Sequence, residues 1–198
     1  MRLICRGDRP AQGLICSNHL SYLDIVVYAA VSPCVFVSKR EVGRWPVLGF
    51  FARCGGTIFV NRQSRASAED VARQMAEVMG TGVPVLLFPE GTSTDGSSVL
   101  RFHPTLLEPA VELGSATTAA AIAYRASGVD ERKLCWYGDD PFLPHLLRTL
   151  TLADLAAEVE FYPERAVAAD RKVAALELRE RVEAMRRRMM RAERQKER

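Results

Sequence analysis

The 198-residue sequence contains few of the residues and motifs that metal-dependent and nucleotide-dependent enzymes need. Its three histidines and five cysteines include no Cys-x-x-Cys pair, and His103 and His145 lack ligand spacing with any carboxylate or thiol. This argues against a metal site. The sequence has neither a Walker A run nor a Gly-x-Gly-x-x-Gly run, so a nucleotide site has no support. The odd number of cysteines favours a reducing compartment, and we expect a cytoplasmic protein.

A long hydrophobic run is also missing. The apolar stretch from Ile25 to Val37 is interrupted by Ser32 and Pro33, so it falls short of the ~20 residues that span a bilayer. The first six residues contain no apolar region typical of a signal peptide. We therefore expect no transmembrane helix, and any contact with a membrane is expected to be peripheral.

Over most of the chain, neither positive nor negative charge is in large excess. The 27 Lys and Arg residues against 24 Asp and Glu residues give a net charge of +3, which argues against nucleic acid as a partner. The excess is concentrated in residues 171–198, where 11 basic residues stand against 5 acidic ones. The apolar residues of this segment share one helical face: Leu178, Val182, Met185 and Met189. We expect residues 1–169 to form one domain and residues 170–198 to form a basic amphipathic helix or tail, which either contacts anionic lipid or packs on the domain.

Short apolar runs that end in a polar residue recur along the chain and indicate buried strands. With 48% hydrophobic and 26% charged residues, the composition is that of a globular protein. The expected strands are residues 13–16, 35–37, 57–60, 83–88, 117–124 and 158–162, and the expected helices are residues 25–30, 67–79 and 104–113. In the last strand, Glu158 and Glu160 are expected to point outward. This order predicts a single α/β domain with a mixed central sheet flanked by helices.

His19 stands at the junction between the first predicted strand and the first predicted helix. A neutral imidazole can take a proton from a hydroxyl when a carboxylate holds its other N–H. Asp24 is the nearest carboxylate, but a spacing of five residues places two side chains on different faces of a helix. The pair therefore forms only if His19 lies in the turn and Asp24 in the helix. The alternative is that His19 merely caps the helix.

Polar residues also end three later predicted strands. Glu90 precedes a glycine-rich turn whose N–H groups can hold a phosphate or an oxyanion, although an ordinary hydrogen-bonded turn explains the same residues. Lys39 and Arg62 follow the strands at 35–37 and 57–60. Each of these two cations either neutralises a phosphate or is simply solvated.

Taken together, these blocks resemble in order and spacing the lysophospholipid acyltransferase family, which includes 1-acylglycerol-3-phosphate O-acyltransferases. The family pattern is Asn-His, four residues and Asp, here Asn18, His19 and Asp24. It continues in three later blocks: residues 39–49, residues 56–62, and Phe-Pro-Glu-Gly-Thr at residues 88–92. The resemblance covers most of residues 13–163 and implies a glycerolipid acyltransferase-like fold.

The resemblance implies transfer of a fatty acyl group from acyl-CoA or acyl carrier protein to the free hydroxyl of a lysolipid. The acceptor would be 1-acylglycerol-3-phosphate, with no covalent acyl-enzyme and no bound cofactor, in phospholipid biosynthesis at the cytoplasmic face of a membrane. His19 would be the general base, and Asp24 would orient it. Lys39 and Arg62 would help hold the anionic head. The residues that would shape the acceptor site are Glu90, Gly91 and Thr92.

The sequence departs from the family pattern at two positions. Ser93 stands where an arginine usually follows Phe-Pro-Glu-Gly-Thr, which weakens the case for a phosphate head group. Ala119 stands where a proline is usual in the later apolar block. The continuation after Ser93 looks more like the bacterial branch that includes lyso-ornithine lipid acyltransferases. Their acceptor carries an amino acid head, and this acceptor is the alternative. The family usually has a hydrophobic segment before the Asn-His block, where only 17 residues stand here.

Two other classes of function compete with this interpretation. A hydrolase would use Ser17, Ser21 or Cys16 as a nucleophile beside His19, but the sequence has no Gly-x-Ser-x-Gly elbow to present a serine. Cys16 is better explained as a small buried strand residue. A non-catalytic membrane-surface binding protein is the other alternative, and the intact His19, Asp24 and Glu90 argue against it.

Overall fold

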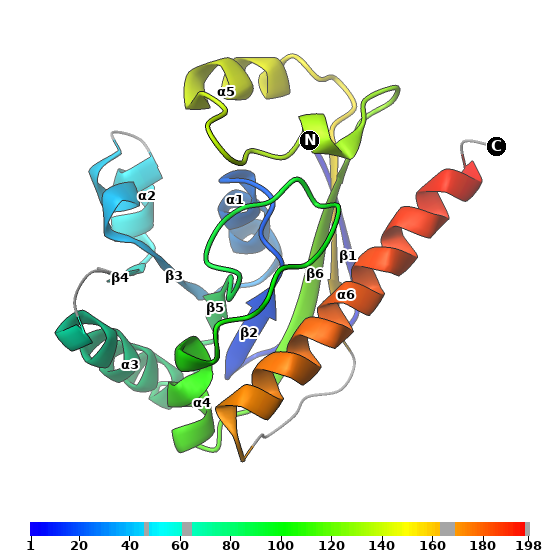
Figure 1. Ribbon diagram of the computed structural model, residues 1–198. Helices are drawn as coiled ribbons and strands as arrows, with labels where there is room; N and C mark the ends of the chain where they lie inside the picture. Colours follow the sequence, from blue (N-terminus) through cyan, green and yellow to red (C-terminus); the bar gives the residue numbers. More distant parts are fainter. Residues whose placement is uncertain (46–47, 61–64, 163–168, 197–198) are drawn as a thin grey trace.

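The computed structural model describes residues 1–45, 48–60, 65–162 and 169–196, and their centre is a seven-stranded sheet (Figure 1). Its strands are β1 Arg2–Arg6, β2 Leu14–Ser17, β3 Val35–Lys39, β4 Ile58–Val60, β5 Val85–Leu87, β6 Thr117–Arg125 and β7 Ala156–Phe161. The order across the sheet is β1-β7-β6-β2-β5-β3-β4. The strands from β6 to β4 run parallel, whereas β7 is antiparallel to β6. The predicted mixed sheet is therefore confirmed.

The helices lie on both faces of this sheet (Figure 1). They are α1 Leu23–Val31, α2 Leu48–Cys54, α3 Arg65–Gly80, α4 Glu108–Glu112, α5 Phe142–Leu150 and α6 Arg171–Lys196, with short 3₁₀ turns η1 Arg40–Arg44, η2 Pro104–Leu107 and η3 Glu131–Lys133. The helix predicted at 104–113 begins as the 3₁₀ turn η2 and continues as α4. Among the described strands and α-helices, those that were not predicted are β1, α2 and α5. Within the described ranges, no helix is both long and apolar enough to cross a bilayer.

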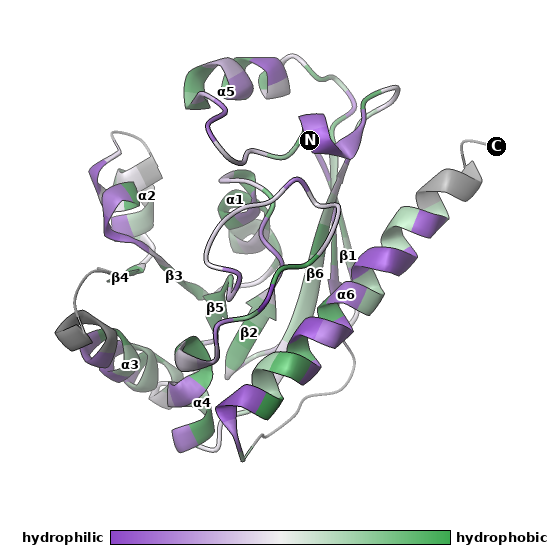
Figure 2. Ribbon diagram, viewed as in Figure 1, coloured by the Kyte–Doolittle hydropathy of each residue, from purple (hydrophilic) through white to green (hydrophobic). Residues whose placement is uncertain are grey.

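The core consists of two apolar layers, one on each face of the sheet. Leu14 and Cys16 of β2 belong to the layer under α3, α4 and α6, whereas Ile15 between them belongs to the layer under α1. This alternation is expected because successive strand residues point to opposite faces. Figure 2 shows the same pattern as hydrophobic central strands under helices of mixed hydropathy. Apolar burial on both faces fixes the central strand that leads to His19.

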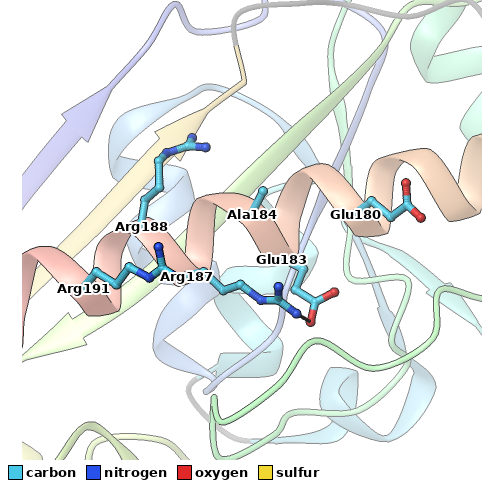
Figure 3. Close-up of a pocket in the computed structure, with 6 residues that line it drawn as sticks. All are labelled: Glu180, Glu183, Ala184, Arg187, Arg188 and Arg191. Atoms are coloured by element: carbon cyan, nitrogen blue, oxygen red, sulfur yellow. Dashed lines mark hydrogen bonds and ion pairs between the residues drawn. The ribbon is translucent and has the colours of Figure 1, made fainter.

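The C-terminal helix α6 packs along β6. The four apolar residues expected on one face are all buried: Leu178, Val182, Met185 and Met189. The opposite face is charged and lines a surface hollow of about 380 Å³, where Arg187 donates a hydrogen bond to Glu183 (Figure 3). The predicted amphipathic helix thus packs on the domain through its apolar face and has its charged face at the surface.

The expectation that Glu158 points outward is wrong. Its side chain is buried and pairs with Arg6 at 2.7 Å and with Arg125 at 2.7 Å. Glu158 lies opposite Ala123 of β6, on the face that α6 covers. The alternating pattern was correct, but α6 covers the face of the sheet that was expected to be exposed, and Arg6 of the unpredicted neighbouring strand β1 pairs with Glu158 there.

Candidate active site

Polar segments gather at the edge of the sheet where the parallel strands end. The turn 18–22 follows β2, the segment 88–96 follows β5, and Lys39 ends β3. Because parallel strands end at the same edge, residues far apart in the sequence meet there, and open α/β sheets bind ligands at this edge. The turn 18–22 follows β2, which lies between β6 and β5.

His19 and Asp24 form a close pair in this turn. The distance from His19 Nδ1 to Asp24 Oδ2 is 2.7 Å. Since α1 begins at Leu23, Asp24 lies in its first turn and His19 in the preceding loop, which is the arrangement that a five-residue spacing requires. The Asp24 side chain is fully buried, whereas the His19 side chain is 21% exposed. The imidazole is therefore held inside the protein on one side and is partly exposed to solvent.

Asp24 accepts hydrogen bonds from several other donors. The backbone N–H groups of Leu20 and Ser21 donate to Oδ2 at 2.7 and 3.1 Å, and the Tyr124 hydroxyl donates to Oδ1 at 2.6 Å. A carboxylate surrounded by donors acts only as an acceptor, so His19 must donate its Nδ1–H. The neutral ring then carries its lone pair on Nε2, where it can take a proton from a hydroxyl.

The segment after β5 holds His19 from the other side. The His19 N–H donates to Glu90 Oε1 at 2.9 Å, and the His19 carbonyl accepts from the Thr94 N–H at 2.9 Å. The His19 ring stacks on Phe88 with 4.2 Å between ring centroids and 17° between planes. These contacts fix both the backbone and the ring plane of His19.

Glu90 belongs to this segment, and its side chain is buried and does not project into solvent. Its two carboxylate oxygens accept from the N–H groups of His19, at 2.9 Å, and Leu100, at 2.8 Å. Burial raises the pKa of Glu90 above its usual value, and these two hydrogen bonds partly offset the rise. In this geometry Glu90 links two segments. Gly91 beside it is buried at φ +74°, a conformation that favours glycine.

Among the described residues, the others expected at the site form no hydrogen bond or ion pair with the His19–Asp24 pair. Thr92 is exposed, and its hydroxyl lies 3.5 Å from the Ser93 carbonyl. Lys39 is exposed at the end of β3, which is separated from β2 by β5. Arg62 lies outside the described residues. The structure thus brings His19, Asp24 and Glu90 into one cluster and leaves Lys39 at the same sheet edge.

Two residues of this cluster were not assigned a role from the sequence. The Asn18 side chain pairs with the backbone of Ile122 in β6, accepting at 2.9 Å and donating at 3.1 Å. Tyr124, two residues further along β6, holds Asp24. Asn18 stood in the motif beside His19, and Tyr124 is the single aromatic residue at the end of an alanine-rich strand. Neither signal indicates its partner.

The three possible nucleophiles beside His19 have other roles. The Ser17 hydroxyl donates to the Asn18 carbonyl at 3.0 Å and lies 2.6 Å from the Tyr28 hydroxyl. The Ser21 hydroxyl accepts from the Leu23 N–H. Burial raises the pKa of the Cys16 thiol well above its usual range, so it stays protonated. Within the described residues, no group of histidine, cysteine and carboxylate side chains is arranged to hold a metal ion.

Comparison with known proteins gives consistent matches. The model of the Acyltransferase family matches residues 5–125. The chain is 39% identical over 145 residues to the lyso-ornithine lipid O-acyltransferase of Pseudomonas aeruginosa, an alignment that covers 73% of this chain and 56% of that protein. It is 32% identical over 154 residues to the 1-acyl-sn-glycerol-3-phosphate acyltransferase of Neisseria gonorrhoeae, covering 78% of this chain and 60% of that protein.

A solved structure shares the fold. The crystal structure of the 1-acyl-sn-glycerophosphate acyltransferase PlsC from Thermotoga maritima superposes with a TM-score of 0.64 at 19% identity, covering 96% of this chain and 72% of that one. The two sequence relatives are longer, and the present chain spans 56% and 60% of their lengths.

Proposed function

The chain belongs to the acyltransferase family, and from this premise we propose that it transfers a fatty acyl group to the free hydroxyl of a lysolipid. The observation that carries the proposal is the His19–Asp24 pair, with Nδ1 held at 2.7 Å and the ring partly exposed. His19 Nε2 takes the hydroxyl proton while the oxygen attacks the thioester carbonyl. When the tetrahedral intermediate collapses, the thiolate leaves and receives the proton from His19, so no acyl-enzyme forms.

The acyl donor is acyl-CoA or acyl carrier protein, and two acceptors compete. For 1-acylglycerol-3-phosphate, Lys39 and Arg62 are the proposed cations for the phosphate, and Glu90, Gly91 and Thr92 shape the acceptor site. The uncharged Ser93, half-buried beside Thr92, favours the lyso-ornithine lipid instead, as does the similarity to the Pseudomonas aeruginosa protein. A phosphate needs compensating positive charge more than an amino acid head does.

We also propose that the protein works at the cytoplasmic surface of a membrane, where its acceptor resides. The support is the helix α5, which packs on the turn after His19 and presents three leucines to solvent. Tyr22 of that turn contacts Phe142 with 4.9 Å between ring centroids, and its hydroxyl lies 3.0 Å from His145 Nδ1. An apolar surface this close to the candidate base gives a lipid a short path to it.

Thiol release in detergent micelles tests the reaction. Palmitoyl-CoA and palmitoyl-acyl carrier protein are supplied separately, with lysophosphatidic acid or lyso-ornithine lipid as acceptor and His19→Ala as the control. Acceptor-dependent release identifies the head group. General base catalysis typically contributes 10²- to 10⁴-fold, so we expect His19→Ala to lose nearly all activity while remaining folded. A folded His19→Ala retaining more than about a tenth of the rate would reject His19 as the base. No release with either acceptor favours a non-catalytic lipid-binding protein.

A further inference from the structure

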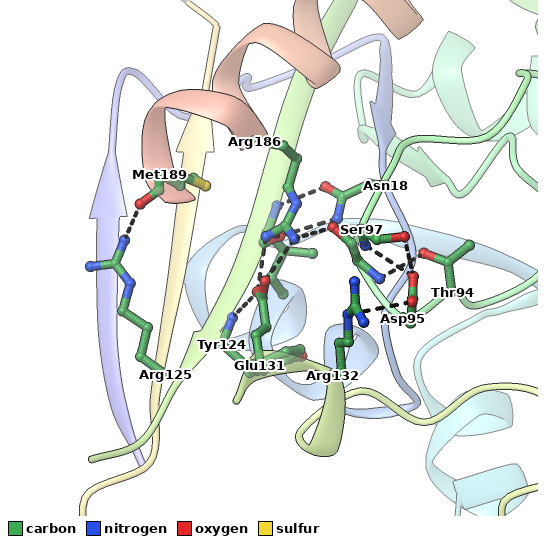
Figure 4. Close-up of polar contacts among 12 residues, drawn as sticks. Asn18, Thr94, Asp95, Ser97, Tyr124, Arg125, Glu131, Arg132, Arg186 and Met189 are labelled. Atoms are coloured by element: carbon green, nitrogen blue, oxygen red, sulfur yellow. Dashed lines mark hydrogen bonds and ion pairs between the residues drawn. The ribbon is translucent and has the colours of Figure 1, made fainter. Parts of the chain in front are cut away.

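Arg186 is a buried arginine on the inner face of α6. Its side chain is 3% exposed and forms a two-pronged ion pair with Glu131, at 2.9 Å from Nη1 and 2.8 Å from Nη2. The same two nitrogens also donate to backbone carbonyls, Nη1 to Ile122 at 3.0 Å and Nη2 to Gly96 at 2.9 Å (Figure 4). One guanidinium therefore joins α6, β6, η3 and the loop after β5.

The first carbonyl leads directly to His19. Ile122 is the residue whose N–H and carbonyl pair with the Asn18 side chain, and Asn18 immediately precedes His19. The Ile122 carbonyl thus accepts from both Asn18 and Arg186. The guanidinium fixes the strand position against which the Asn18 amide is aligned.

The second carbonyl leads to His19 by another route. The Gly96 N–H donates to the Thr94 hydroxyl at 3.3 Å, and the Thr94 N–H donates to the His19 carbonyl at 2.9 Å. A Cβ at Gly96 would lie 2.8 Å from Arg186 Nη2, and Gly96 has φ +76°. Only glycine allows the guanidinium to come this close to the loop.

Glu131 extends the network to Asp24. Its Oε1 accepts from the Tyr124 N–H at 2.9 Å, and the Tyr124 hydroxyl holds Asp24 Oδ1. Replacing a buried ion pair by well-packed apolar residues of similar volume is often neutral or stabilising, so the Arg186–Glu131 pair is weak evidence for a role in stability. Its contacts to two carbonyls on separate segments give it a different role.

We propose that Arg186 is a positioning residue that aligns His19 with Asp24 by clamping β6 and the 94–96 loop on either side of the turn 18–22. It touches neither His19 nor Asp24 and acts through Asn18, Thr94 and Tyr124. The alignment of His19 by Arg186 does not depend on what reaction the protein catalyses, whereas the effect of Arg186 on catalysis rests on the proposed acyl transfer.

The test variant is the double replacement Arg186→Met with Glu131→Gln. It leaves no unpaired buried charge, and the glutamine oxygen can still accept from the Tyr124 N–H. The matched control is Arg188→Met with Glu160→Gln, because Arg188 also joins α6 to a strand, at 2.5 Å from Glu160, but among the described residues it forms no hydrogen bond or ion pair with the turn 18–22. Arg186→Lys keeps the positive charge but lacks the planar guanidinium whose two nitrogens reach the two carbonyls. This variant replaces the double variant in the test if the double variant does not fold.

Two measurements are made on protein whose folding is checked by its urea midpoint. The first is the low-field proton resonance of the His19 Nδ1–H, identified by its loss in His19→Gln. The second is kcat for acyl transfer. We expect the double variant to shift or broaden the resonance and to lower kcat by at least about tenfold at unchanged donor KM. Arg186→Lys should change both readouts in the same direction, and the control pair neither.

An unshifted resonance in the folded double variant, or in Arg186→Lys where only that variant folds, overturns the proposal. So does a loss of kcat that matches the control pair. If the wild-type protein transfers no acyl group, the proposed function fails, and the resonance alone still decides whether Arg186 positions His19.

Discussion

At the scale of single residues, the Asp24 carboxylate is held from two sides. The N–H groups of Leu20 and Ser21 hold one oxygen, and the hydroxyl of Tyr124, one hundred residues after Asp24 in the sequence, holds the other. Burial raises the pKa of Tyr124 well above its usual value, which favours the protonated hydroxyl that donates to Asp24. A carboxylate fixed at both oxygens presents a fixed acceptor to the His19 ring.

Tyr124→Phe tests this support because it removes the donor and leaves the ring. Asp24 Oδ1 loses its partner in a fully buried site, which costs about 1–3 kcal/mol of the free energy of unfolding. We expect kcat to fall about tenfold, equivalent to about 1.4 kcal/mol, with KM values nearly unchanged. Steady-state kinetics and urea unfolding measure the two effects.

Tyr28→Phe is the matched control for that experiment. Tyr28 is also fully buried, but its hydroxyl lies 2.6 Å from the Ser17 hydroxyl, and within the described residues it is not hydrogen-bonded to Asp24. We expect Tyr28→Phe to lose stability and to keep kcat. Equal losses of kcat in both variants, or full kcat in Tyr124→Phe, would show that the Tyr124 hydroxyl does not support the base.

Glu90 gives a prediction about pH. Because burial raises its pKa, folded protein binds more protons than unfolded protein at pH values from the ordinary value of 4.5 up to the raised value. The contribution of Glu90 to stability is therefore fully present below 4.5 and is lost as the pH rises through this window. Glu90→Gln cannot titrate and leaves one buried N–H without an acceptor, which costs about 1–3 kcal/mol.

We therefore expect the stability difference between wild type and Glu90→Gln to be largest at low pH and to narrow as the pH rises. The free energy of unfolding in urea, measured over a series of pH values for both proteins, gives this difference. A difference that widens with pH would mean that the two backbone hydrogen bonds outweigh burial and that the pKa is lowered instead.

The sequence predicted some of these residues and not others. His19 and Asp24 are five residues apart, so a local motif and the helix boundary were enough to anticipate their pairing. Tyr124 and Arg186 are brought to the site by the pairing of β6 with β2 and by the packing of α6. Arg186 stands among three consecutive arginines, and only burial distinguishes it from its exposed neighbours Arg187 and Arg188.

At the scale of elements, the strands and helices with strong periodicity were predicted within a few residues, and the weak ones were missed. β1 was missed because its arginines, Arg2 and Arg6, hide a short edge strand. α5 was missed because it contains Pro144 and presents leucines outward. A proline in the first turn of a helix lacks only an N–H that has no partner there, so the helix tolerates it.

α5 carries the prediction for membrane contact. Leu143, Leu147 and Leu150 are 59%, 56% and 71% exposed and share one helical face. Replacing all three by serine should weaken binding to vesicles by at least about tenfold, because burying even part of a leucine side chain is worth on the order of 1 kcal/mol. Co-sedimentation with vesicles containing anionic lipid measures the effect.

The matched control replaces Val173 and Leu176 of α6 by serine, because these residues are 52% and 56% exposed. Equal weakening in the control would mean that exposed apolar area, and not the place of α5, governs binding.

At the scale of the whole molecule, the candidate site is assembled from segments that span residues 18 to 186. In the local sequence the turn 18–22 joins β2 to α1, and its contacts with distant parts of the chain include those to the segment after β5, to β6 and to α5. A site built in this way depends on the complete fold. The sequence predicted the sheet and the His19–Asp24 pair because these follow from local patterns. It could not predict the residues that contact the pair, since those contacts depend on packing between distant elements.

The five cysteines report on this dependence because they differ in burial. Cys54 is exposed, whereas Cys16 and Cys135 are buried and burial raises the pKa of both thiols well above their usual range. Since the thiolate is the reactive form, iodoacetamide should modify Cys54 first in native protein. Cys34 should react slowly, because burial raises its pKa to about 12.

The buried cysteines Cys16 and Cys135 report on unfolding of the site, since Cys16 lies in β2 beside the candidate site and Cys135 lies near Glu131. Both should become reactive together, at the urea concentration where transfer activity is lost. Peptide mapping after timed alkylation measures each site. Modification of Cys16 before global unfolding would show that β2 opens locally, and it would return Cys16 to consideration as a nucleophile.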